Sequence, residues 1–209
     1  AQPPLYKVKR GSSEQYLKDE RALEDYLIAS GTEDAVLTTG AGMTHAGADL
    51  LQIARQAREI VHAIEGLNTR YNRQIVEQAA IVGGLNAEAL ADPEQAEALA
   101  ARVANRLDRV AEDVERGWQG RSDGQGGLIF TRTVRGVAEN HHIDAQLLAS
   151  ADARKIRATV EKLEDLYRGV GKLTRKDQAF DVFGPSTLFE AISAAGRKGV
   201  SLQRYKGLG

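Results

Sequence analysis

The chain has 209 residues, of which 42% are hydrophobic and 27% are charged, as is usual for globular domains. It has no cysteine, which excludes disulfide scaffolds and thiolate metal sites and favours a reducing compartment. No apolar run approaches the roughly 18 residues of a membrane span, and no secretory leader is visible. We therefore expect a soluble, cytoplasmic protein without a membrane partner.

The net charge of −1 hides an uneven distribution of charge along the chain. Residues 1–18 hold four basic side chains and one acidic, residues 19–153 hold 12 and 22, and residues 154–209 hold 12 and 6. If the two basic ends fold together, one face attracts phosphates while the acidic middle repels them. The alternative is that the charges only occupy solvated positions.

The predicted elements begin with a hairpin and a helix. Residues 4–11, PLYKVKRG, read as a strand that closes in a glycine turn, and residues 14–20, EQYLKDE, are its expected hairpin partner. An amphipathic helix is expected over Glu20–Ala29, with Leu23 and Leu27 on its apolar side.

Residues 34–39 predict a short strand, and the glycine-rich residues 40–47 predict a loop that lacks the lysine of a P-loop. Asp92 and Pro93 have the residue types of an N-cap and a first helical turn, and the helix that they start is expected to run to Gly117. Between the loop at 40–47 and Asp92, an apolar stripe at helical spacing predicts another long helix. Its buried side is expected to carry Leu50, Ala54, Ala57, Val61 and Ile64.

After a turn-rich connection over 118–127, residues 127–136 predict a half-buried strand, and its hairpin partner is expected within 138–150. A short strand is expected over 179–184 and a final strand over 201–205. Two further helices are indicated by apolar positions, namely Ile156, Val160, Leu163 and Tyr167 for the first and Leu188, Ile192 and Ala195, ending before Gly199, for the second. The predicted fold is α+β and helix-rich.

No catalytic or metal-binding constellation is visible in the sequence. There is no Asp-x-Asp pair, and Asp113 and Glu115, the nearest approach, are expected in a helix where their side chains point apart. His141 and His142 face opposite sides of a predicted strand and cannot chelate one ion together. We therefore expect neither a catalytic residue nor a metal site in this chain.

The basic ends carry the specific motifs. On a strand, Arg204 and Lys206 of RYKGLG project on one face with Tyr205 opposite, which suits either phosphate contact or an ordinary basic strand. The segments QPPLYKVKRG (2–11) and LQRYKGLG (202–209) resemble those that bracket the end of the TOPRIM domain in the DNA gyrase B subunits, a family of type IIA topoisomerase subunits.

The resemblance implies a division of the chain. Residues 1–29 would be the end of the TOPRIM core, with KDERALEDYLIA similar to the family's acidic helix, and residues 199–209 the return strand and RYKGLG motif. Residues 30–198 are similar in place and size to the long insertion of Gram-negative gyrase B. We thus expect a helix-rich insertion domain with mixed β-elements, flanked by partial TOPRIM, Rossmann-like strands. Because the family continues after the second motif, Gly209 is expected to be a boundary within a larger subunit.

The resemblance further implies a parent that introduces negative supercoils with ATP, as an A2B2 assembly of the DNA gyrase A and B subunits on double-stranded DNA. The residues that bind ATP and Mg²⁺ in the family all lie upstream of Ala1, so no catalytic residue is carried over. DNA contacts are expected at the basic ends, although a solvated basic edge that discourages strand pairing is the alternative. The candidates are Lys7, Lys9, Arg10, Arg204 and Lys206.

Two interpretations of the insertion stay open. It is either a buttress that docks on TOPRIM or on the gyrase A subunit, or an accessory that wraps DNA. A topoisomerase IV B subunit, which usually lacks so long an insertion, and a stand-alone interaction module are the alternatives for the whole chain. The DNA-wrapping interpretation would use local basic clusters such as Arg154, Lys155 and Arg157, or Lys172, Arg175 and Lys176.

Overall fold

The computed structural model describes residues 3–161 and 164–205 of the chain. The chain forms two compact units. The first unit combines Ala1–Arg58 with Val170–Gly209, and the second unit is Glu59–Gly169. The fold is of the α+β class, as the sequence predicts. The assignment of residues 1–29 and 199–209 to the TOPRIM domain and of residues 30–198 to the insertion stays a prediction.

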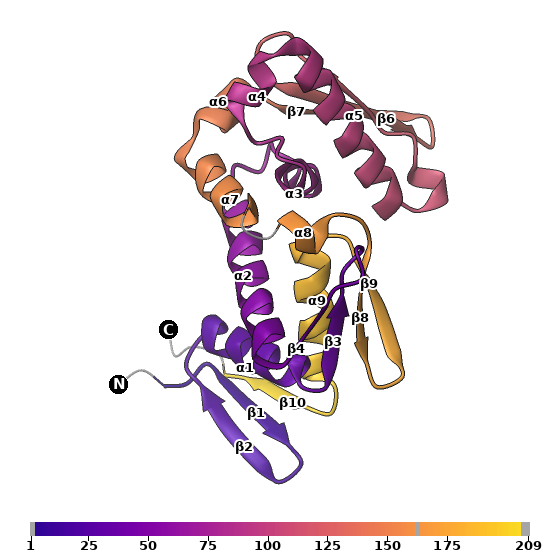
Figure 1. Ribbon diagram of the computed structural model, residues 1–209. Helices are drawn as coiled ribbons and strands as arrows, with labels where there is room; N and C mark the ends of the chain where they lie inside the picture. Colours follow the sequence, from indigo (N-terminus) through magenta and orange to yellow (C-terminus); the bar gives the residue numbers. More distant parts are fainter. Residues whose placement is uncertain (1–2, 162–163, 206–209) are drawn as a thin grey trace. The chain divides into compact units, whose positions relative to one another are not determined.

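The first unit contains two antiparallel sheets, each built from both ends of the chain (Figure 1). One sheet has the strand order β10-β1-β2 and the other has the order β4-β3-β8-β9. The helix α2, Gly47–Glu65, begins in this unit, and the boundary between the units falls within it. The other bounds are β1 Tyr6–Arg10, β2 Ser13–Leu17, α1 Glu20–Thr32, β3 Ala35–Thr38, β4 Thr44–Ala46, β8 Gly171–Arg175, β9 Gln178–Val182, α9 Pro185–Arg197 and β10 Ser201–Arg204.

Helix α1 begins at a side-chain cap and packs on the sheet β10-β1-β2. The Asp19 carboxylate accepts a hydrogen bond from the Ala22 backbone N–H at 2.8 Å, which satisfies one of the free donors of the first turn. The apolar side of α1 and the inner face of the sheet form one core, composed of Tyr6, Val8, Leu17, Leu23 and Leu27. Burial of these side chains fixes which face of β1 is turned to solvent.

Helices α1 and α9 approach each other so closely that glycine is required on both. A Cβ atom on Gly31 of α1 would lie 2.0 Å from the Ile192 carbonyl oxygen, and one on Gly196 of α9 would lie 2.2 Å from that of Leu27. Neither glycine has a positive φ, so the requirement comes from the approach of the two backbones.

Arg175, at the end of β8, is buried and joins the C-terminal ends of these two helices. Its Nη1 donates to the Ala195 carbonyl at 2.6 Å, its Nε to that of Glu33 at 3.0 Å, and its Nη2 to that of Ser30 at 3.3 Å. The last carbonyls of a helix lack partners within the helix and carry partial negative charge, which a guanidinium neutralises. Arg175 therefore stabilises the fold and is not available to the DNA-binding cluster that the sequence suggests.

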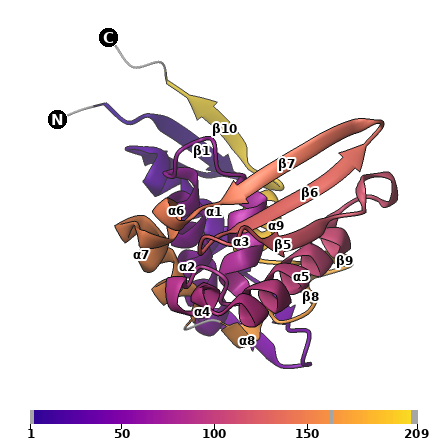
Figure 2. The ribbon, with the colours of Figure 1, turned by 90° about the horizontal axis from the view of Figure 1, so that it is seen from above.

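The described residues of the second unit form one antiparallel sheet, in the order β5-β6-β7, with α5 beside β5 (Figure 2). Helix α5 starts as predicted, because Asp92 accepts a hydrogen bond from the Glu94 N–H at 3.1 Å and Pro93 is its first residue. The bounds are α3 Arg73–Ile81, α4 Ala87–Ala91, α5 Pro93–Val110, a 3₁₀ turn Asp113–Glu115, β5 Gln119–Ser122, β6 Leu128–Val134, β7 Val137–Ile143, α6 Ala145–Ala149, α7 Ala151–Glu161 and α8 Glu164–Tyr167.

Helix α5 ends at Val110, so the prediction that it continues to Gly117 is wrong. The Asp108 carboxylate accepts hydrogen bonds from the backbone N–H groups of Gly117 and Trp118, both at 3.0 Å, and so holds the chain in a return path. Val114, which extends the apolar stripe in the sequence, is 69% exposed. The 3₁₀ turn takes the place of the last expected helical turns.

Three strands lie where the sequence predicts a loop or no regular element. β4 occupies part of the glycine-rich segment 40–47, β5 part of the turn-rich connection 118–127, and β8 pairs with both β3 and β9. Where one helix is predicted from Ile156 to Tyr167, the structure describes α7 and α8, and Leu163 lies outside the described residues.

Replacing Tyr167 with phenylalanine is expected to raise the free energy of unfolding by about 1 kcal/mol. The Tyr167 side chain is 1% exposed, burial raises its pKa, and within the described residues its hydroxyl has no hydrogen-bond partner. Urea unfolding followed by circular dichroism measures the change.

Tyr71→Phe is the matched control in the same unit, because the Tyr71 hydroxyl donates to Asp144 at 2.7 Å. The free energy of unfolding of this variant is expected to be about 1 kcal/mol lower than that of the unaltered chain. An equal loss in both variants would mean that the Tyr167 hydroxyl has a partner.

Candidate nucleic-acid interface

The solvent-facing side of the sheet β10-β1-β2 carries basic and aromatic side chains. Residues directly opposite each other in an antiparallel sheet point to the same face. Lys7 lies opposite Tyr16 and Gln203, and Lys9 lies opposite Glu14 and Ser201. The buried Tyr6 and Val8 point to the other side. We call the surface formed by Lys7, Lys9, Glu14, Tyr16, Gln203 and Tyr205 the outer face.

The outer face is held together by an ion pair and by ring contacts. Lys7 Nζ lies 3.4 Å from the Glu14 carboxylate and 5.7 Å from the centre of the Tyr16 ring. Tyr16 and Tyr205 are stacked, with ring centres 6.5 Å apart and planes 20° from parallel. The Glu14 charge, followed by Tyr16, raises the pKa of Lys7. Tyr16 is 56% exposed, so its ring is accessible to a partner.

Of the four predicted DNA contacts that the structure describes, Lys7 and Lys9 share this face. Strands β1 and β10 pair, but Arg204 lies opposite Tyr6 and therefore points to the side that packs on α1. Arg10 points to that side as well, where Nη1 donates to the Ser30 hydroxyl at 3.0 Å and lies 3.7 Å from Glu33. Lys206 lies outside the described residues.

Sequence reasoning missed the aromatic part of the outer face. The sequence predicts that Tyr205 points away from Arg204, and its stacking on Tyr16 is consistent with this. The sequence indicates Tyr16 only as part of the hairpin partner of β1. The alternation of Tyr16 with Glu14 on β2, read together with the Lys7–Lys9 alternation on β1, is the signal that could have placed all four on one side.

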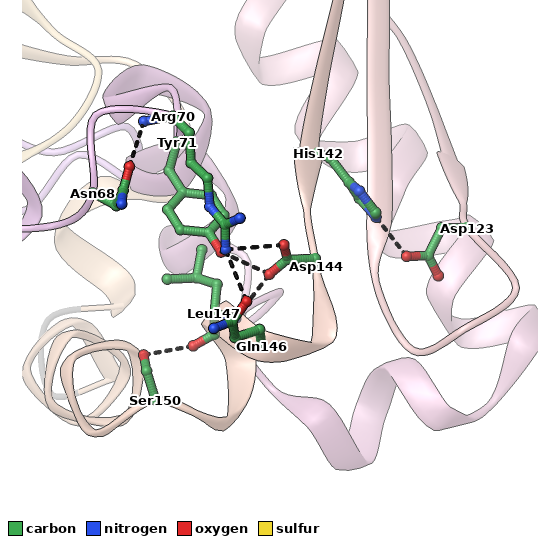
Figure 3. Close-up of polar contacts among 9 residues, drawn as sticks. All are labelled: Asn68, Arg70, Tyr71, Asp123, His142, Asp144, Gln146, Leu147 and Ser150. Carbon is green, nitrogen blue, oxygen red and sulfur yellow. Dashed lines mark hydrogen bonds and ion pairs between the residues drawn. The ribbon is translucent and has the colours of Figure 1, made fainter.

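A polar cluster in the second unit is satisfied by its own members (Figure 3). Asp144 accepts from the Leu147 N–H at 2.9 Å, which caps α6, and from the Tyr71 hydroxyl at 2.7 Å. Arg70 lies 3.4 Å from Asp144 and donates to Gln146 at 3.0 Å. Burial raises the pKa of Asp144, but these hydrogen bonds and the Arg70 charge outweigh it and hold the pKa below the usual value. The cluster fixes the start of α6.

The two adjacent histidines have separate partners. His142 Nε2 lies 2.6 Å from Asp123, while His141 lies 3.3 Å from Glu139 and its ring lies against Trp118 (Figure 3 shows the first pair). Over residues 3–161 and 164–205, no three His, Asp or Glu side chains are grouped as metal ligands. None of the helices in these ranges has the length and hydropathy of a membrane span.

Comparison with known proteins gives the family. A family model described as "DNA gyrase B subunit insert domain" matches residues 35–184, and one described as "GyrB, hook" matches residues 4–30. The DNA gyrase B subunit of Caulobacter vibrioides (strain NA1000 / CB15N) is 39% identical over 209 residues, that of Rickettsia bellii (strain RML369-C) 34% over 211 and that of Campylobacter jejuni subsp. jejuni 28% over 214.

Each of these similarities covers 100% of this chain, which in turn spans only 24% to 26% of the length of these relatives. The insert-domain match alone extends over more than half of the chain. The chain therefore belongs to the DNA gyrase B subunit family and contains its insert domain.

Proposed function

We propose that the chain is part of the B subunit of a cytoplasmic, ATP-dependent type II topoisomerase that introduces negative supercoils. In this proposal it assembles with the DNA gyrase A subunit into an A2B2 heterotetramer on double-stranded DNA. ATP and Mg²⁺ bind to parts of the B subunit upstream of Ala1. The residues of this chain carry no catalytic group; they help to bind DNA and couple the TOPRIM domain to the gyrase A subunit.

The observation that supports the proposal most strongly is the similarity along the whole chain to proteins named as B subunits of DNA gyrase. Within this chain, the outer face has the chemistry for a nucleic acid, because Lys7 and Lys9 share it with the exposed Tyr16 ring.

The outer face offers two lysines to a phosphate backbone, with Glu14 compensating part of the Lys7 charge. Lys7 and Lys9 are two residues apart on β1, so their Cα atoms lie about 7 Å apart. At this spacing the two ammonium groups can each contact a separate phosphate of one DNA strand. The exposed Tyr16 ring adds an amphipathic contact at the edge of the sheet.

Replacing Lys7 and Lys9 together with glutamine is expected to weaken binding of duplex DNA about tenfold at low salt. The slope of log affinity against log salt is negative, and each lost phosphate contact reduces its magnitude by roughly 0.9, so the magnitude is expected to fall by about two. Fluorescence anisotropy of a labelled duplex across a sodium chloride series measures both quantities on the 209-residue chain.

Two matched double variants accompany this measurement. Arg10→Gln/Arg204→Gln removes the same charge from the other side of the same sheet, and Lys172→Gln/Lys176→Gln removes it from the hairpin of β8 and β9. If the Lys7/Lys9 variant lost no more affinity than the hairpin variant, the outer face would not be the DNA contact. A loss of affinity confined to the Arg10/Arg204 variant would mean that DNA contacts the side of the sheet that faces α1.

The topoisomerase assignment is tested with the same substitutions in the intact B subunit, assembled with the gyrase A subunit. Relaxed plasmid, ATP and Mg²⁺ are supplied, and superhelical density is read from gels. The unaltered assembly is expected to introduce negative supercoils, and the Lys7/Lys9 variant is expected to do so more slowly. No ATP-dependent supercoiling by the unaltered assembly would contradict the proposed function, whatever the chain itself binds.

A further inference from the structure

Four arginines gather around one cavity of the second unit. The cavity has a volume of about 240 Å³ and lies between the C-terminal half of α5 and the end of α8. Arg102, Arg106 and Arg109 reach it from α5, where their spacing of four and three residues places them on one side of the helix. Arg168 reaches it from the other side.

The three arginines of α5 are close enough to repel one another. Burial, followed by the charges of Arg109 and Arg102, lowers the pKa of Arg106, while the Glu77 carboxylate acts in the opposite direction. Arg106 is fixed by a hydrogen bond from its Nε to Gln78 Oε1 at 2.8 Å. This crowding of like charge is unfavourable in the free protein, and an anion in the cavity would relieve it.

The arginines differ in how far their charges are compensated. Arg168 donates to Glu164 Oε1 at 2.6 Å and lies 3.8 Å from the Asp165 carboxylate, so these two acids compensate its charge. Within the described residues, neither Arg102 nor Arg109 has a hydrogen bond or an ion pair. Because the Glu77 carboxylate compensates the charge of Arg106, the α5 side of the cavity keeps an excess of about two positive charges. This excess occurs in a unit that holds more acidic than basic residues.

These features select the ligand by its charge, shape and size. A phosphate monoester carries a charge of about −1.5 to −2 near pH 7 and three free oxygens, which match the excess charge and the three guanidinium groups. A carboxylate carries one charge and two oxygens and would leave the cluster uncompensated. The volume lies below the range of pockets that enclose drug-sized molecules, so a terminal phosphate group fits better than a whole nucleotide.

We infer that the cavity lined by Arg102, Arg106, Arg109 and Arg168 binds a terminal phosphate group. The group is free phosphate or the end of a larger molecule, such as a nucleotide or the 5′ end of a DNA strand. The site does not depend on the outer face, which belongs to the other unit. Its test therefore fails or succeeds separately from that of the proposed function.

The expected result is binding of inorganic phosphate and pyrophosphate by the 209-residue chain, measured by isothermal titration calorimetry at constant ionic strength in sodium chloride. In Arg102→Gln/Arg109→Gln the affinity is expected to fall tenfold to a hundredfold, because two charged hydrogen-bond donors are removed. Glutamine is a good helix former, so α5 is expected to stay folded. The corresponding double lysine variant keeps the charge without the planar guanidinium group. Its phosphate affinity is expected to lie between those of the unaltered chain and the double glutamine variant.

The control variant is Arg121→Gln/Lys155→Gln, which removes the same charge from exposed positions on β5 and α7. It is expected to bind phosphate as the unaltered chain does. ADP and a 5′-phosphorylated duplex then distinguish the sources, since they carry the terminal phosphate group on different molecules. The same duplex without its 5′ phosphate shows whether that group is required. Equal affinity in the arginine variant and its control would overturn the inference. So would competition by a glutamate peptide that is as strong as that by phosphate.

Discussion

Replacing Arg175 with methionine is expected to lower the free energy of unfolding by at least about 3 kcal/mol. The substitution removes the three guanidinium hydrogen bonds, of 2.6 to 3.3 Å, to the carbonyls of Ser30, Glu33 and Ala195. A hydrogen bond to a charged group contributes about 1.5–3 kcal/mol, and the loss of a cation next to helix C-termini adds to it. Urea unfolding of the whole chain, monitored by circular dichroism, measures the loss.

Two further substitutions show whether the fork of hydrogen bonds is responsible. Arg175→Lys retains the charge but cannot reach three carbonyls at once, so it is expected to recover less than half of the loss. Lys172→Met, at an exposed position of the same strand with a long ion pair of 3.9 Å, is expected to change stability by less than about 0.5 kcal/mol. Similar values for Arg175→Met and Lys172→Met would refute the capping role.

Alanine at Gly31 or Gly196 is expected to destabilise the chain by about 2 kcal/mol or more. Alanine is intrinsically the better helix residue by about 1 kcal/mol, so propensity alone predicts the opposite sign. The added methyl would meet the backbone of the facing helix at 2.0 or 2.2 Å, and backbone cannot move aside as a side chain can. Thermal and urea unfolding of each variant decide between the two signs.

Gly66→Ala is the control for the glycine variants. A Cβ there would meet its nearest atoms, both carbonyl oxygens, at 3.5 Å, which is ordinary contact. We expect the free energy of unfolding of Gly66→Ala to lie within about 0.5 kcal/mol of that of the unaltered chain. Gly31→Ala/Gly196→Ala is expected to cost less than the sum of its parts, because one displacement of α9 relieves both clashes. Stabilisation by either single variant would show that α1 and α9 are not so closely packed.

Elements specified by neighbouring residues could be predicted from the sequence. The α5 start depends on Asp92 and Pro93, which lie side by side, and the β6–β7 hairpin follows from a local alternation. Helix α9 has its apolar positions at helical spacing, with Gly199 in a left-handed conformation after its end. In each case the stabilising contact joins residues that are close in the chain, so a local pattern contains the information.

The missed strands depend on partners that are distant in the sequence. β5 has no apolar alternation, and a Cβ on its Gly120 would lie 2.4 Å from the Ala100 carbonyl of α5, so this glycine is required by packing and not by a turn. β8 pairs with β3, which precedes it by more than 130 residues. Arg175 looks like a surface cation in sequence, because all three of its acceptors belong to other elements.

The candidate sites show the same limit. The basic residues of β1 and β10 are visible in the sequence, but only the register of the two strands separates Lys7 and Lys9 from Arg204. On α5 the spacing of the arginines can be read directly. The cavity also needs Arg168, which lies beyond β5, β6 and β7 in the chain, and no sequence pattern links it to α5.

The pairing of Tyr6 with Arg204 sets an order of events during synthesis. A ribosome adds roughly 5–20 residues per second, so the edge of β1 that receives β10 waits about 10–40 s for its partner. All of the residues of the second unit are made before β8 emerges, and that unit has its own sheet to complete in the interval. Meanwhile the hairpin of β1 and β2 exposes an unpaired strand edge, which is where a nascent chain is prone to join another copy of itself.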